Sequence, residues 1–349
     1  MSQKPLRIAV VGATGAVGTV ALKLLEERKH PASHIVALAS ARSEGAELRY
    51  LGGKLTVREG RPEMFDGVDV AFLAASSSVS KSLQPEINKR GVLMIDKGSG
   101  FRMRPDVPLV VPEVNGSDID WHSGIIATPN CTTTPLVMVV DALRKISPVT
   151  RVTVASYQAV SGSGSDAQVE LTEQSRAVLD GRPAVPSVYP HQIAFNVLPQ
   201  VDGFEADGYT KEEHKMVNES RKILHDPDLA VSATCVRVPV QVSHSESVQL
   251  EFESAISPNE AREALASYKG MCVVDDPAKR VYPMPHEAAG RDEVFVGRIR
   301  RDISHARGLA LWLSCDNLRK GAALNAMQIL DEVVRRGKLN VTRHTAVRT

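Results

Sequence analysis

The sequence predicts an α/β protein of two domains, a doubly wound parallel sheet followed by an α+β domain with a mixed or antiparallel sheet. Its 349 residues suit two domains of roughly 150 residues each. In the first third, short continuous apolar runs alternate with segments of helical periodicity, which is typical of strands buried on both faces of a parallel sheet. After Cys131 the apolar runs lengthen, and several alternate apolar with polar residues, which indicates strands with one covered face.

The elements of the first domain follow from this alternation. Residues 6–11 (LRIAVV) form an apolar run bounded by glycine, which predicts a buried strand. Apolar residues then recur at helical spacing from Val17 to Leu25, and four charged residues end that segment. The same pattern predicts strands at 34–40, 68–74 and 92–95, and a helix at 81–90 before the last of these strands.

The second domain is predicted from longer runs. A helix is expected at 136–146, and a final helix at 321–336 is expected to pack back on the first domain. Strands are expected at 149–160, 231–242, 247–255 and 307–314. The predicted division is therefore a dinucleotide-binding domain of residues 1–130 with 317–349, and a catalytic and dimerisation domain of residues 131–316.

Composition excludes several classes of function. The chain has 42 Lys and Arg against 41 Asp and Glu, a net charge of +1, so it lacks the basic excess of a nucleic-acid-binding protein. No apolar stretch approaches the roughly 18 residues of a membrane span. The four cysteines form no C-x-x-C pair, which argues against a disulfide framework or a zinc site. We expect free thiols, no metal, and a cytoplasmic protein.

A glycine-rich loop lies between the first predicted strand and helix. Gly12, Gly15 and Gly18 are spaced three apart, which allows a tight turn, close approach of the backbone to a pyrophosphate, and close helix packing. The helix N-terminus adds free N–H groups and a partial positive charge. The loop therefore predicts a dinucleotide site; the alternative is a purely structural turn.

The end of the second predicted strand indicates which dinucleotide is bound. NAD-selective sites place an Asp or Glu there for the ribose 2′-hydroxyl. This chain instead reads Ser40-Ala-Arg42-Ser43, and an arginine flanked by hydroxyls suits a 2′-phosphate. We therefore expect NADP; the alternative is that Arg42 is simply a solvated surface side chain.

Cys131 is the candidate nucleophile. It lies in Pro-Asn-Cys-Thr-Thr-Thr-Pro, just before the predicted helix at 136–146. The helix dipole lowers the pKa of a thiol in this position and favours the thiolate. We expect the threonines to cap the helix and Pro135 to lie in its first turn. The alternative is an inert buried cysteine.

Several motifs together resemble the bacterial aspartate-β-semialdehyde dehydrogenase family over nearly the whole chain. They are GATGAVG (12–18), SARSEG (40–45), PNCTTTP (129–135), SYQAVSGSG (156–164), KEEHK (211–215), CVRVPVQVSHS (235–245) and DNLRKGAALN (316–325). The resemblance implies a Rossmann-type first domain and a homodimer formed through the second. It implies the reversible NADP-dependent conversion of aspartate semialdehyde and phosphate to aspartyl phosphate, toward lysine, diaminopimelate, threonine and methionine.

The resemblance also implies roles for the catalytic residues. Cys131 is the nucleophile, because a thiolate can form a hemithioacetal that loss of hydride converts to a thioester. His244 is the acid/base, which imidazole suits near neutral pH. Gln158, at the end of a predicted strand, positions the acyl group. Taken alone, His244 could be an ordinary strand histidine.

The substrates are anions, so the resemblance implies a set of polar side chains to bind them. Arg237 should clamp the substrate carboxylate in bidentate fashion. Arg102 and Lys215 should hold phosphate with Asn130 nearby, and Glu212 should meet the substrate ammonium. For Glu212 and Lys215 an alternative stands, since Thr210 and Glu213 fit a capping box and the pair could be a solvated first helical turn. The implied cofactor contacts are Gly12, Thr14, Gly15, Ala16, Val17, Ser40, Arg42, Ser43, Ser76, Ser161, Gly162 and Asn317.

One departure and two rivals qualify this interpretation. Family members commonly read Asp-Asn-Ser-Ser before the phosphate arginine, whereas this chain reads Asp96-Lys97-Gly98-Ser99, so the local phosphate contacts are in doubt. N-acetyl-γ-glutamyl-phosphate reductases share the chemistry but generally carry Pro-Gly-Cys-Tyr at the nucleophile. A catalytically silent nucleotide-binding paralogue is the other alternative, and it is disfavoured by the joint presence of the proposed catalytic residues.

Strand parity makes a structural prediction about the site. Arg237 and His244 are seven residues apart, so a regular strand would point their side chains to opposite faces. The proposed mechanism needs both beside one substrate carbon. Pro239 lies between them and cannot donate to a strand ladder. We therefore predict a break or irregularity between Arg237 and His244.

Overall fold

The computed structural model describes residues 5–339 and contains two compact units. The first comprises Met1–Pro129 with Ala322–Thr349, and the second comprises Asn130–Gly321. Each is described separately below.

The first unit is built on a six-stranded parallel sheet. Its strands lie in the order β5-β2-β1-β6-β7-β8, with every neighbouring pair parallel. The bounds are β1 (Ile8–Val11), β2 (Ile35–Ala39), β5 (Arg58–Glu59), β6 (Val70–Leu73), β7 (Leu93–Asp96) and β8 (Ile125–Ala127). The predicted doubly wound sheet is confirmed. Because β1 lies between β2 and β6, the chain reverses direction along the sheet at β1, where such folds bind ligands.

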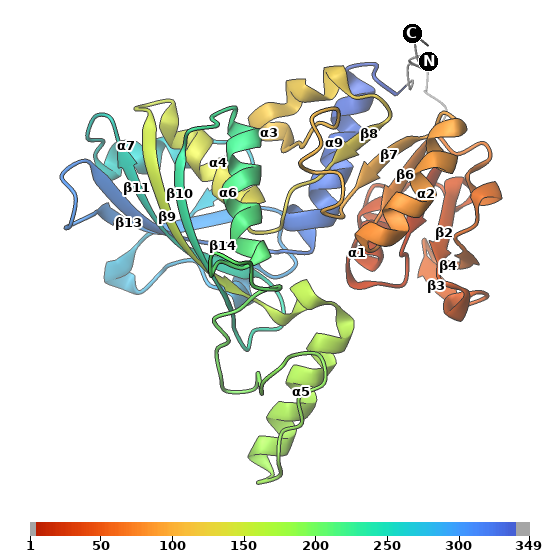
Figure 1. Ribbon diagram of the computed structural model, residues 1–349, viewed down its shortest axis with the longest axis horizontal. Helices are drawn as coiled ribbons and strands as arrows, with labels where there is room; N and C mark the ends of the chain where they lie inside the picture. The colour runs from red at the N-terminus through yellow and green to blue at the C-terminus, as the bar shows by residue number, and fades with distance from the viewer. Residues whose placement is uncertain (1–4, 340–349) are drawn as a thin grey trace. The chain divides into compact units, whose positions relative to one another are not determined.

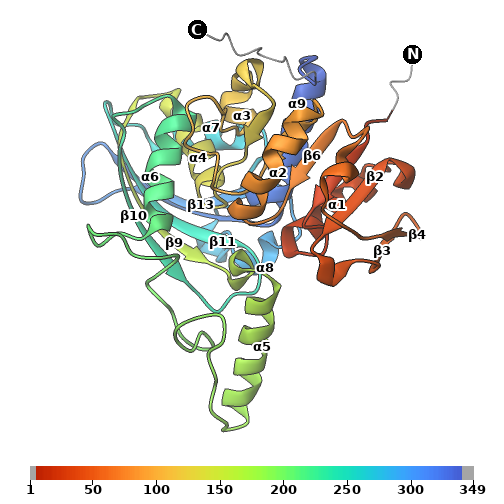
Figure 2. The same ribbon diagram turned by 45° about the vertical axis from the view of Figure 1, so that its right-hand side comes forward.

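Helices flank this sheet (Figure 2). They are α1 (Ala16–Glu27), α2 (Ser77–Lys89), α3 (Pro112–Asn115) and α9 (Leu324–Arg335). Helix α2 begins before the predicted start because Ser76 caps it, accepting a hydrogen bond from the Val79 amide. Helix α9 packs against α1, α3 and β7. A hairpin of β3 (Glu47–Tyr50) and β4 (Gly53–Thr56) was not predicted, since its strands are mostly exposed and polar.

The second unit contains a mixed six-stranded sheet, as predicted. Its order is β10-β9-β11-β14-β13-β12; the outer pairs β10–β9 and β12–β13 are parallel and the inner pairs antiparallel. The bounds are β9 (Val149–Gln158), β10 (Ala230–Arg237), β11 (His244–Phe252), β12 (Met271–Val273), β13 (Val294–Arg301) and β14 (Gly308–Cys315). The strand expected at 231–242 is too long by its last five residues, and the one expected at 247–255 begins earlier, at His244.

Three helices pack on one face of this sheet, namely α4 (Thr133–Arg144), α6 (Lys211–Leu224) and α7 (Pro258–Ser267) (Figure 1). Helix α5 (Ser165–Leu179) instead projects away from the sheet, and α8 (Pro285–Ala288) is a single turn. The chain expected to start a helix at 321 forms a π turn at Arg319–Ala323 before α9 begins.

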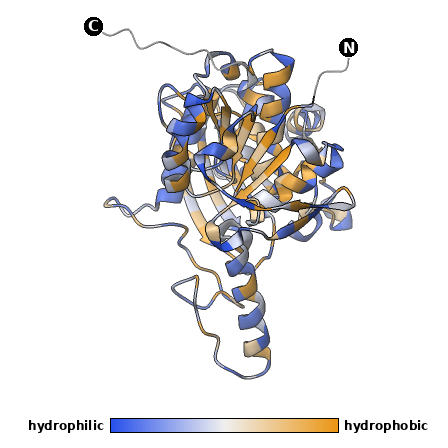
Figure 3. Cartoon of the chain, turned by 90° about the vertical axis from the view of Figure 1, so that its right-hand side faces the viewer, coloured by the Kyte–Doolittle hydropathy of each residue, from blue (hydrophilic) through white to orange (hydrophobic). Residues whose placement is uncertain are grey.

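Apolar residues gather on the strands in both units, and polar residues on the outer helix surfaces (Figure 3). Nearly all of α4 is buried, from Thr133 to Leu143, so it forms the centre of the second unit's core. Burial of apolar surface stabilises a fold by roughly 25 cal/mol per Å². The turn just before α4 is therefore anchored to the most buried helix of its unit.

Candidate active site

Three predicted site residues form one row across neighbouring strands. Strand β9 ends at Gln158, β10 ends at Arg237, and β11 begins at His244. Arg237 pairs with Gln158, and extending the β11–β9 register by one residue beyond Ser245–Tyr157 places His244 opposite Gln158. Side chains in one row point to the same face of a sheet. All three are buried, so they converge in the interior.

The chain leaves the sheet between Arg237 and His244, as strand parity predicted. After Arg237, the Val238 amide still donates to the Gln158 carbonyl at 3.0 Å. The next amide along the chain, that of Val240, donates instead to the carbonyl of Val238. Ser243 then has a φ of +78°, a left-handed conformation that redirects the backbone into β11. The predicted break is confirmed, and it puts Arg237 and His244 on opposite sides of β9.

Asn130 builds the turn that presents Cys131 at the start of α4. Its Oδ1 accepts hydrogen bonds from the Thr132 amide at 2.9 Å and the Thr132 hydroxyl at 2.7 Å. Its carbonyl accepts from the amide of Thr134 at 3.0 Å. The prediction that threonines cap the helix is correct in position only: Thr132 is the N-cap residue, but its side chain makes no cap hydrogen bond. An asparagine side chain reaches the amide two residues ahead and takes this role instead.

Cys131 and His244 are in contact. The Cys131 Sγ lies 3.3 Å from His244 Nε2. The other ring nitrogen, Nδ1, accepts a hydrogen bond from the Ala159 amide at 2.9 Å, and the Ala159 carbonyl accepts one from Arg237 Nη1 at 2.7 Å. Burial, together with the positive charge of Arg237, lowers the pKa of His244 well below its ordinary value. The peptide groups of Ala159 therefore hold both the imidazole and the guanidinium.

Two glycines allow these side chains to approach. A Cβ at Gly162 would lie 3.0 Å from Arg237 Nη1 and 3.3 Å from His244 Nε2. A Cβ at Gly321 would lie 2.9 Å from the Cβ of Cys131. Real Cβ atoms rarely come so close to other heavy atoms. Any side chain at either position would displace a member of the site.

Helix α6 contributes a buried acidic face. The predicted capping box is present, with Thr210 and Glu213 bonded reciprocally at 2.6 and 3.3 Å. Glu212 is nevertheless not part of a solvated turn: it is 5% exposed. Its Oε1 accepts from Asn130 Nδ2 at 2.9 Å and from Gln158 Nε2 at 3.4 Å.

Lys215 forms ion pairs with two carboxylates, Glu212 at 3.0 Å and Asp202 at 2.8 Å. Burial alone would lower the pKa of the Lys215 ammonium, but the two carboxylates outweigh that effect and raise it. Lys215 is therefore a permanent cation at this edge of the site, with a quarter of its side chain exposed.

The glycine loop of the first unit lies at the carboxyl end of β1. Gly12 has a φ of +80°, and a Cβ there would lie 2.5 Å from the Ala74 carbonyl oxygen; a Cβ at Gly18 would lie 2.1 Å from the Gly12 oxygen. Gly15 caps α1 without any side-chain hydrogen bond. The first turn of α1, which includes Ala16 and Val17 and follows the exposed Thr14, thus presents bare backbone, which fits a pyrophosphate.

The residues expected to select the cofactor follow β2 and β6. Ser40 precedes a short 3₁₀ turn that contains Arg42 and Ser43, and Ser76 caps α2 directly after β6. Arg42 is exposed, and within residues 5–339 its guanidinium makes no hydrogen bond or ion pair. An unpaired cation at the end of β2 fits a 2′-phosphate.

Arg102 is hydrogen-bonded to Lys97, the residue at which this sequence differs from the family that it resembles. The Arg102 Nη2 donates to the backbone carbonyl of Lys97 at 2.7 Å, so position 97 supplies a backbone contact that any residue could make. Beside it Asp96 ends β7 and accepts from the Ser80 hydroxyl at 2.6 Å. Burial raises the pKa of Asp96 to about 6.

Ser161 and Asn317 lie together in the second unit. The Ser161 hydroxyl donates to Asn317 Oδ1 at 3.0 Å, and the same oxygen accepts from the Ser243 amide at 2.9 Å. Both predicted cofactor contacts are 2% exposed. Asn317 therefore ties the end of the redirected segment before β11 to the loop after β9.

A second buried acid was not predicted. Glu246, two residues after His244 on β11, is completely buried, and within residues 5–339 neither carboxyl oxygen has a hydrogen-bond partner. Burial raises the pKa of Glu246 well above its ordinary value.

Two clefts open in the second unit. One, of about 460 Å³, is lined by Arg237, Tyr189, His191, Asp202 and Phe204 among others. The Arg237 guanidinium carbon lies 5.8 Å from the Tyr189 ring centroid, within the range of a cation–π contact. This cleft therefore adjoins the proposed carboxylate clamp.

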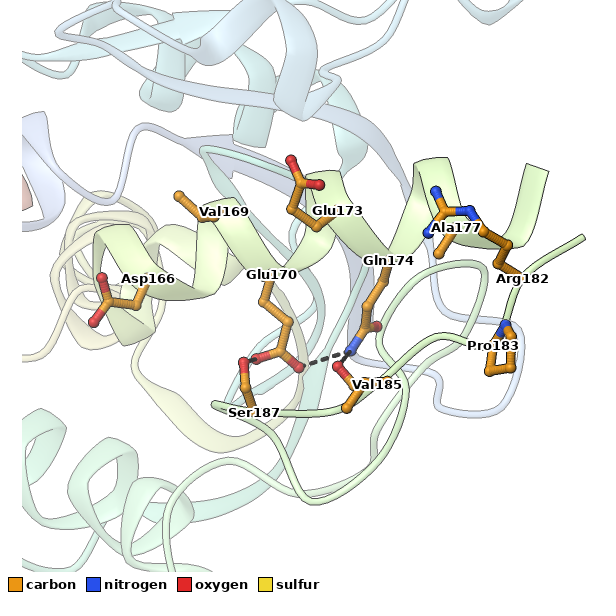
Figure 4. Close-up of a pocket in the computed structure, with 10 residues that line it drawn as sticks. All are labelled: Asp166, Val169, Glu170, Glu173, Gln174, Ala177, Arg182, Pro183, Val185 and Ser187. Atoms are coloured by element: carbon orange, nitrogen blue, oxygen red, sulfur yellow. Dashed lines mark hydrogen bonds between the residues drawn. The ribbon is translucent and has the colours of Figure 1, made fainter. Parts of the chain in front are cut away.

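The other cleft, of about 430 Å³, lies between α5 and the loop at 182–187 (Figure 4). There Glu170 accepts hydrogen bonds from Gln174 at 2.8 Å and from the Ser187 hydroxyl at 2.9 Å. These bonds tie the loop to α5, so the polar groups at the base of this cleft already have partners.

Residues 5–339 have two further properties. No group of three or more His, Cys, Asp or Glu side chains there could hold a metal ion. In the same range, no helix is long and apolar enough to cross a membrane.

Sequence reasoning missed three groups that hold the site. Glu219 accepts a hydrogen bond from the Asn130 amide at 2.6 Å. The sequence could have indicated it, because Glu219 follows Glu212 by seven residues and both therefore lie on one face of α6. The other two are the Ala159 amide, which any residue except proline supplies, and Gly321, whose role is to lack a side chain.

Comparison with known proteins gives two family matches. The model described as "Semialdehyde dehydrogenase, NAD binding domain" matches residues 7–122. The model described as "Semialdehyde dehydrogenase, dimerisation domain" matches residues 140–320.

Individual relatives match nearly the whole chain. Aspartate-semialdehyde dehydrogenase of Aquifex aeolicus is 50% identical, covering 95% of this chain and 98% of that one; the Bacillus subtilis protein is 47% identical, covering 94% and 97%. Among solved structures, aspartate semialdehyde dehydrogenase II of Vibrio cholerae complexed with ASA has a TM-score of 0.91 at 39% identity, covering 95% and 99%. The Candida albicans enzyme with NADP has a TM-score of 0.75 at 25% identity, covering 95% and 99%.

Proposed function

Because the chain belongs to the aspartate-semialdehyde dehydrogenase family, we propose that it interconverts L-aspartate 4-semialdehyde plus phosphate and L-4-aspartyl phosphate, with NADP as the cofactor. The observation that carries the proposal is the 3.3 Å contact between the Cys131 sulfur and His244 Nε2. That contact lies beside a buried arginine and a buried glutamine.

Cys131 is the nucleophile of this proposal. Its sulfur bonds to the carbonyl carbon of the semialdehyde, and the carbonyl electron pair moves to oxygen. Loss of the C–H hydrogen with its electron pair restores the carbonyl as a thioester. Phosphate then attacks that carbon, and the C–S bond breaks to release the thiolate and aspartyl phosphate. His244 lies at the reacting atoms in the acid/base position, and Gln158 positions the acyl group.

Charged side chains bind the two anions and the ammonium of the substrate. Arg237 clamps the substrate carboxylate; its Nε is buried and has no partner within residues 5–339, so it can donate to a ligand without breaking an existing bond. Glu212 binds the ammonium. Phosphate binds Arg102 and Lys215, with Asn130 nearby.

NADP binds the first unit's glycine loop, with Gly12, Thr14, Gly15, Ala16 and Val17 around the pyrophosphate. Ser40, Arg42 and Ser43 meet the 2′-phosphate, and Ser76, Ser161, Gly162 and Asn317 supply further contacts. When bound, NADP accepts or supplies the hydride. The absence of any acidic residue at 40–43 supports NADP over NAD.

The enzyme is proposed to be a cytoplasmic homodimer in lysine, diaminopimelate, threonine and methionine biosynthesis. Four free cysteines, the proposed nucleophile Cys131 among them, suit a reducing compartment. The dimerisation-domain match over residues 140–320 supports pairing through the second unit. Exposed apolar side chains on α5 (Val169 and Leu179) and in the segment that follows it (Val185, Phe195 and Val197) support α5 as part of that interface.

The test is NADP reduction measured with aspartate semialdehyde and, separately, with N-acetylglutamate semialdehyde. We expect phosphate-dependent reduction with the first and little with the second. Preference for the N-acetylated substrate would instead favour the reductase alternative. Binding of NADP without turnover of either substrate would favour a silent paralogue.

A further inference from the structure

Arg237 is held by contacts of three kinds, and one of these depends on a neighbouring side chain. Its backbone amide donates to the Leu198 carbonyl at 2.8 Å, and its carbonyl accepts from the Leu198 amide at 2.9 Å. Its Nη1 donates to the Ala159 carbonyl at 2.7 Å. The third contact is with the Tyr189 ring, whose centroid lies 5.8 Å from the guanidinium carbon. The side chain at position 189 therefore matters to Arg237, whereas Leu198 and Ala159 contribute backbone groups.

The guanidinium of Arg237 keeps one edge for a ligand. Nη1 is used by the Ala159 carbonyl, while Nε is buried and has no partner within residues 5–339. Two parallel N–H bonds to one carboxylate require two nitrogens of the planar group to face it together. A single hydrogen bond at Nη1 leaves the plane free to turn about that bond. A second contact is needed to aim the edge that contains Nε.

The Tyr189 ring can be that second contact. A cation within about 6 Å of a ring centroid is attracted to the ring, most strongly where water is excluded, and Arg237 is only 5% exposed. The ring is itself anchored, since its hydroxyl donates to Ser163 Oγ at 3.0 Å. It also packs against a cluster of buried apolar residues, namely Val160, Ala167, Leu171, Ile193, Ala194 and Leu198. A ring that is anchored in this way can hold the guanidinium in one orientation.

We propose that Tyr189 is a positioning residue for Arg237: its ring holds the guanidinium so that the edge containing Nε meets the carboxylate of the substrate. The inference rests on the proposed function, in which Arg237 clamps that carboxylate, and it names a further residue on which the specificity of the same site depends. The carboxylate does not react, so the contact strengthens binding of the ground state and the transition state alike. Such uniform binding changes KM and leaves kcat as it is.

Two substitutions at position 189 separate the ring from the rest of the side chain. Tyr189→Leu removes the ring and keeps an apolar side chain, whereas Tyr189→Phe keeps the ring and removes only the hydroxyl. We expect the KM for aspartate semialdehyde to rise about ten-fold in Tyr189→Leu, on the scale of a desolvated cation–π contact. We expect kcat and the KM values for NADP and phosphate to stay within about two-fold of the wild type. Tyr189→Phe should have the wild-type KM for aspartate semialdehyde.

The matched control is Phe204→Leu, which removes an aromatic ring from the same cleft and should leave the KM for aspartate semialdehyde unchanged. An equal rise in this KM for the leucine and phenylalanine variants at position 189 would overturn the proposal, because the hydroxyl and not the ring would then be responsible. A rise in all three KM values together with a fall in kcat in Tyr189→Leu would show a general structural role and would also overturn it.

Crystal structures of the two Tyr189 variants without substrate give a readout that does not depend on activity. In Tyr189→Leu we expect the Arg237 guanidinium to leave its position or to occupy several, whereas in Tyr189→Phe it should keep its 2.7 Å bond to the Ala159 carbonyl. An Arg237 side chain in its wild-type position in Tyr189→Leu would overturn the proposal. Failure of the proposed function would appear instead as a wild-type enzyme that does not turn over aspartate semialdehyde, so the two failures are distinguishable.

Discussion

His244 Nε2 lies 3.3 Å from the Cys131 sulfur, although 113 positions separate the two residues in the chain. Each side of this contact has its own anchor. Asn130 fixes the turn before α4, and the Ala159 amide fixes the ring at the start of β11. These two anchors hold the sulfur and the imidazole in contact, and such fixed positioning lowers the entropic cost of a chemical step.

Replacing Arg42 should change cofactor choice. Arg42→Ala removes an exposed cation that has no partner within residues 5–339, so the fold should be unaffected. We expect the KM for NADP to rise at least about ten-fold, the loss of roughly one charge-assisted hydrogen bond, while the KM for NAD barely changes. Equal losses for both cofactors would show that Arg42 does not contact the 2′-phosphate.

Adding one methyl group at Gly321 should displace the nucleophile. The new Cβ of Gly321→Ala would lie 2.9 Å from the Cβ of Cys131, whereas nothing lies within 4 Å of a Cβ at Gly203. We expect kcat/KM to fall by at least about ten-fold in Gly321→Ala and to stay at the wild-type value in the control Gly203→Ala. Unchanged kinetics in both would mean that the π turn at 319–323 does not position Cys131.

Removing the acceptor at Glu219 should loosen the Cys131 turn. Glu219→Ala leaves the Asn130 amide without its 2.6 Å partner, which should cost about 1–3 kcal/mol of unfolding free energy and slow alkylation of Cys131. Glu219→Gln keeps an acceptor oxygen and should lie between the alanine variant and the wild type. A glutamine variant as damaged as the alanine variant in both measurements would mean that the charge of Glu219 matters, rather than its acceptor.

Asp96 should make stability depend on pH. In the unfolded chain the Asp96 carboxyl ionises near pH 3.8, whereas burial in the folded state raises its pKa to about 6. Between these two pH values the folded state therefore binds more protons than the unfolded state. The contribution of Asp96 to stability therefore falls as pH rises through this window, by on the order of 3 kcal/mol in total. We expect Asp96→Asn to gain stability relative to the wild type from about pH 4 to about pH 6 in denaturant titrations. A difference independent of pH would contradict the raised pKa.

Much of the site was predictable because its chemistry is encoded locally. Cys131 was predicted from a motif before a helix, and the break between Arg237 and His244 from strand parity with Pro239 in between. The capping box at Thr210 was correctly predicted, but its presence did not decide whether Glu212 was solvated. That depended on contact with Asn130, 82 positions away.

What the sequence did not reveal depends on tertiary contacts or on the backbone. The Asn130 side chain replaced the threonine caps because of the turn's own geometry. The Ala159 amide carries no side-chain signal at all, although it holds the His244 ring through a 2.9 Å hydrogen bond. Helix α5 went unpredicted because its buried face includes the polar residues Glu170 and Gln174, so the sequence lacks the continuous apolar repeat of a core helix.

The thioester on Cys131 is the central claim, and rapid mixing without phosphate tests it most directly. Enzyme mixed with aspartate semialdehyde and NADP should release about one NADPH per Cys131 in a burst and then stop, with intact-mass spectrometry showing an acyl group on Cys131. Added phosphate should restart turnover, and Cys131→Ser, with NADP binding intact, should give neither burst nor adduct. Steady NADPH formation without phosphate, or a burst in Cys131→Ser, would contradict the account.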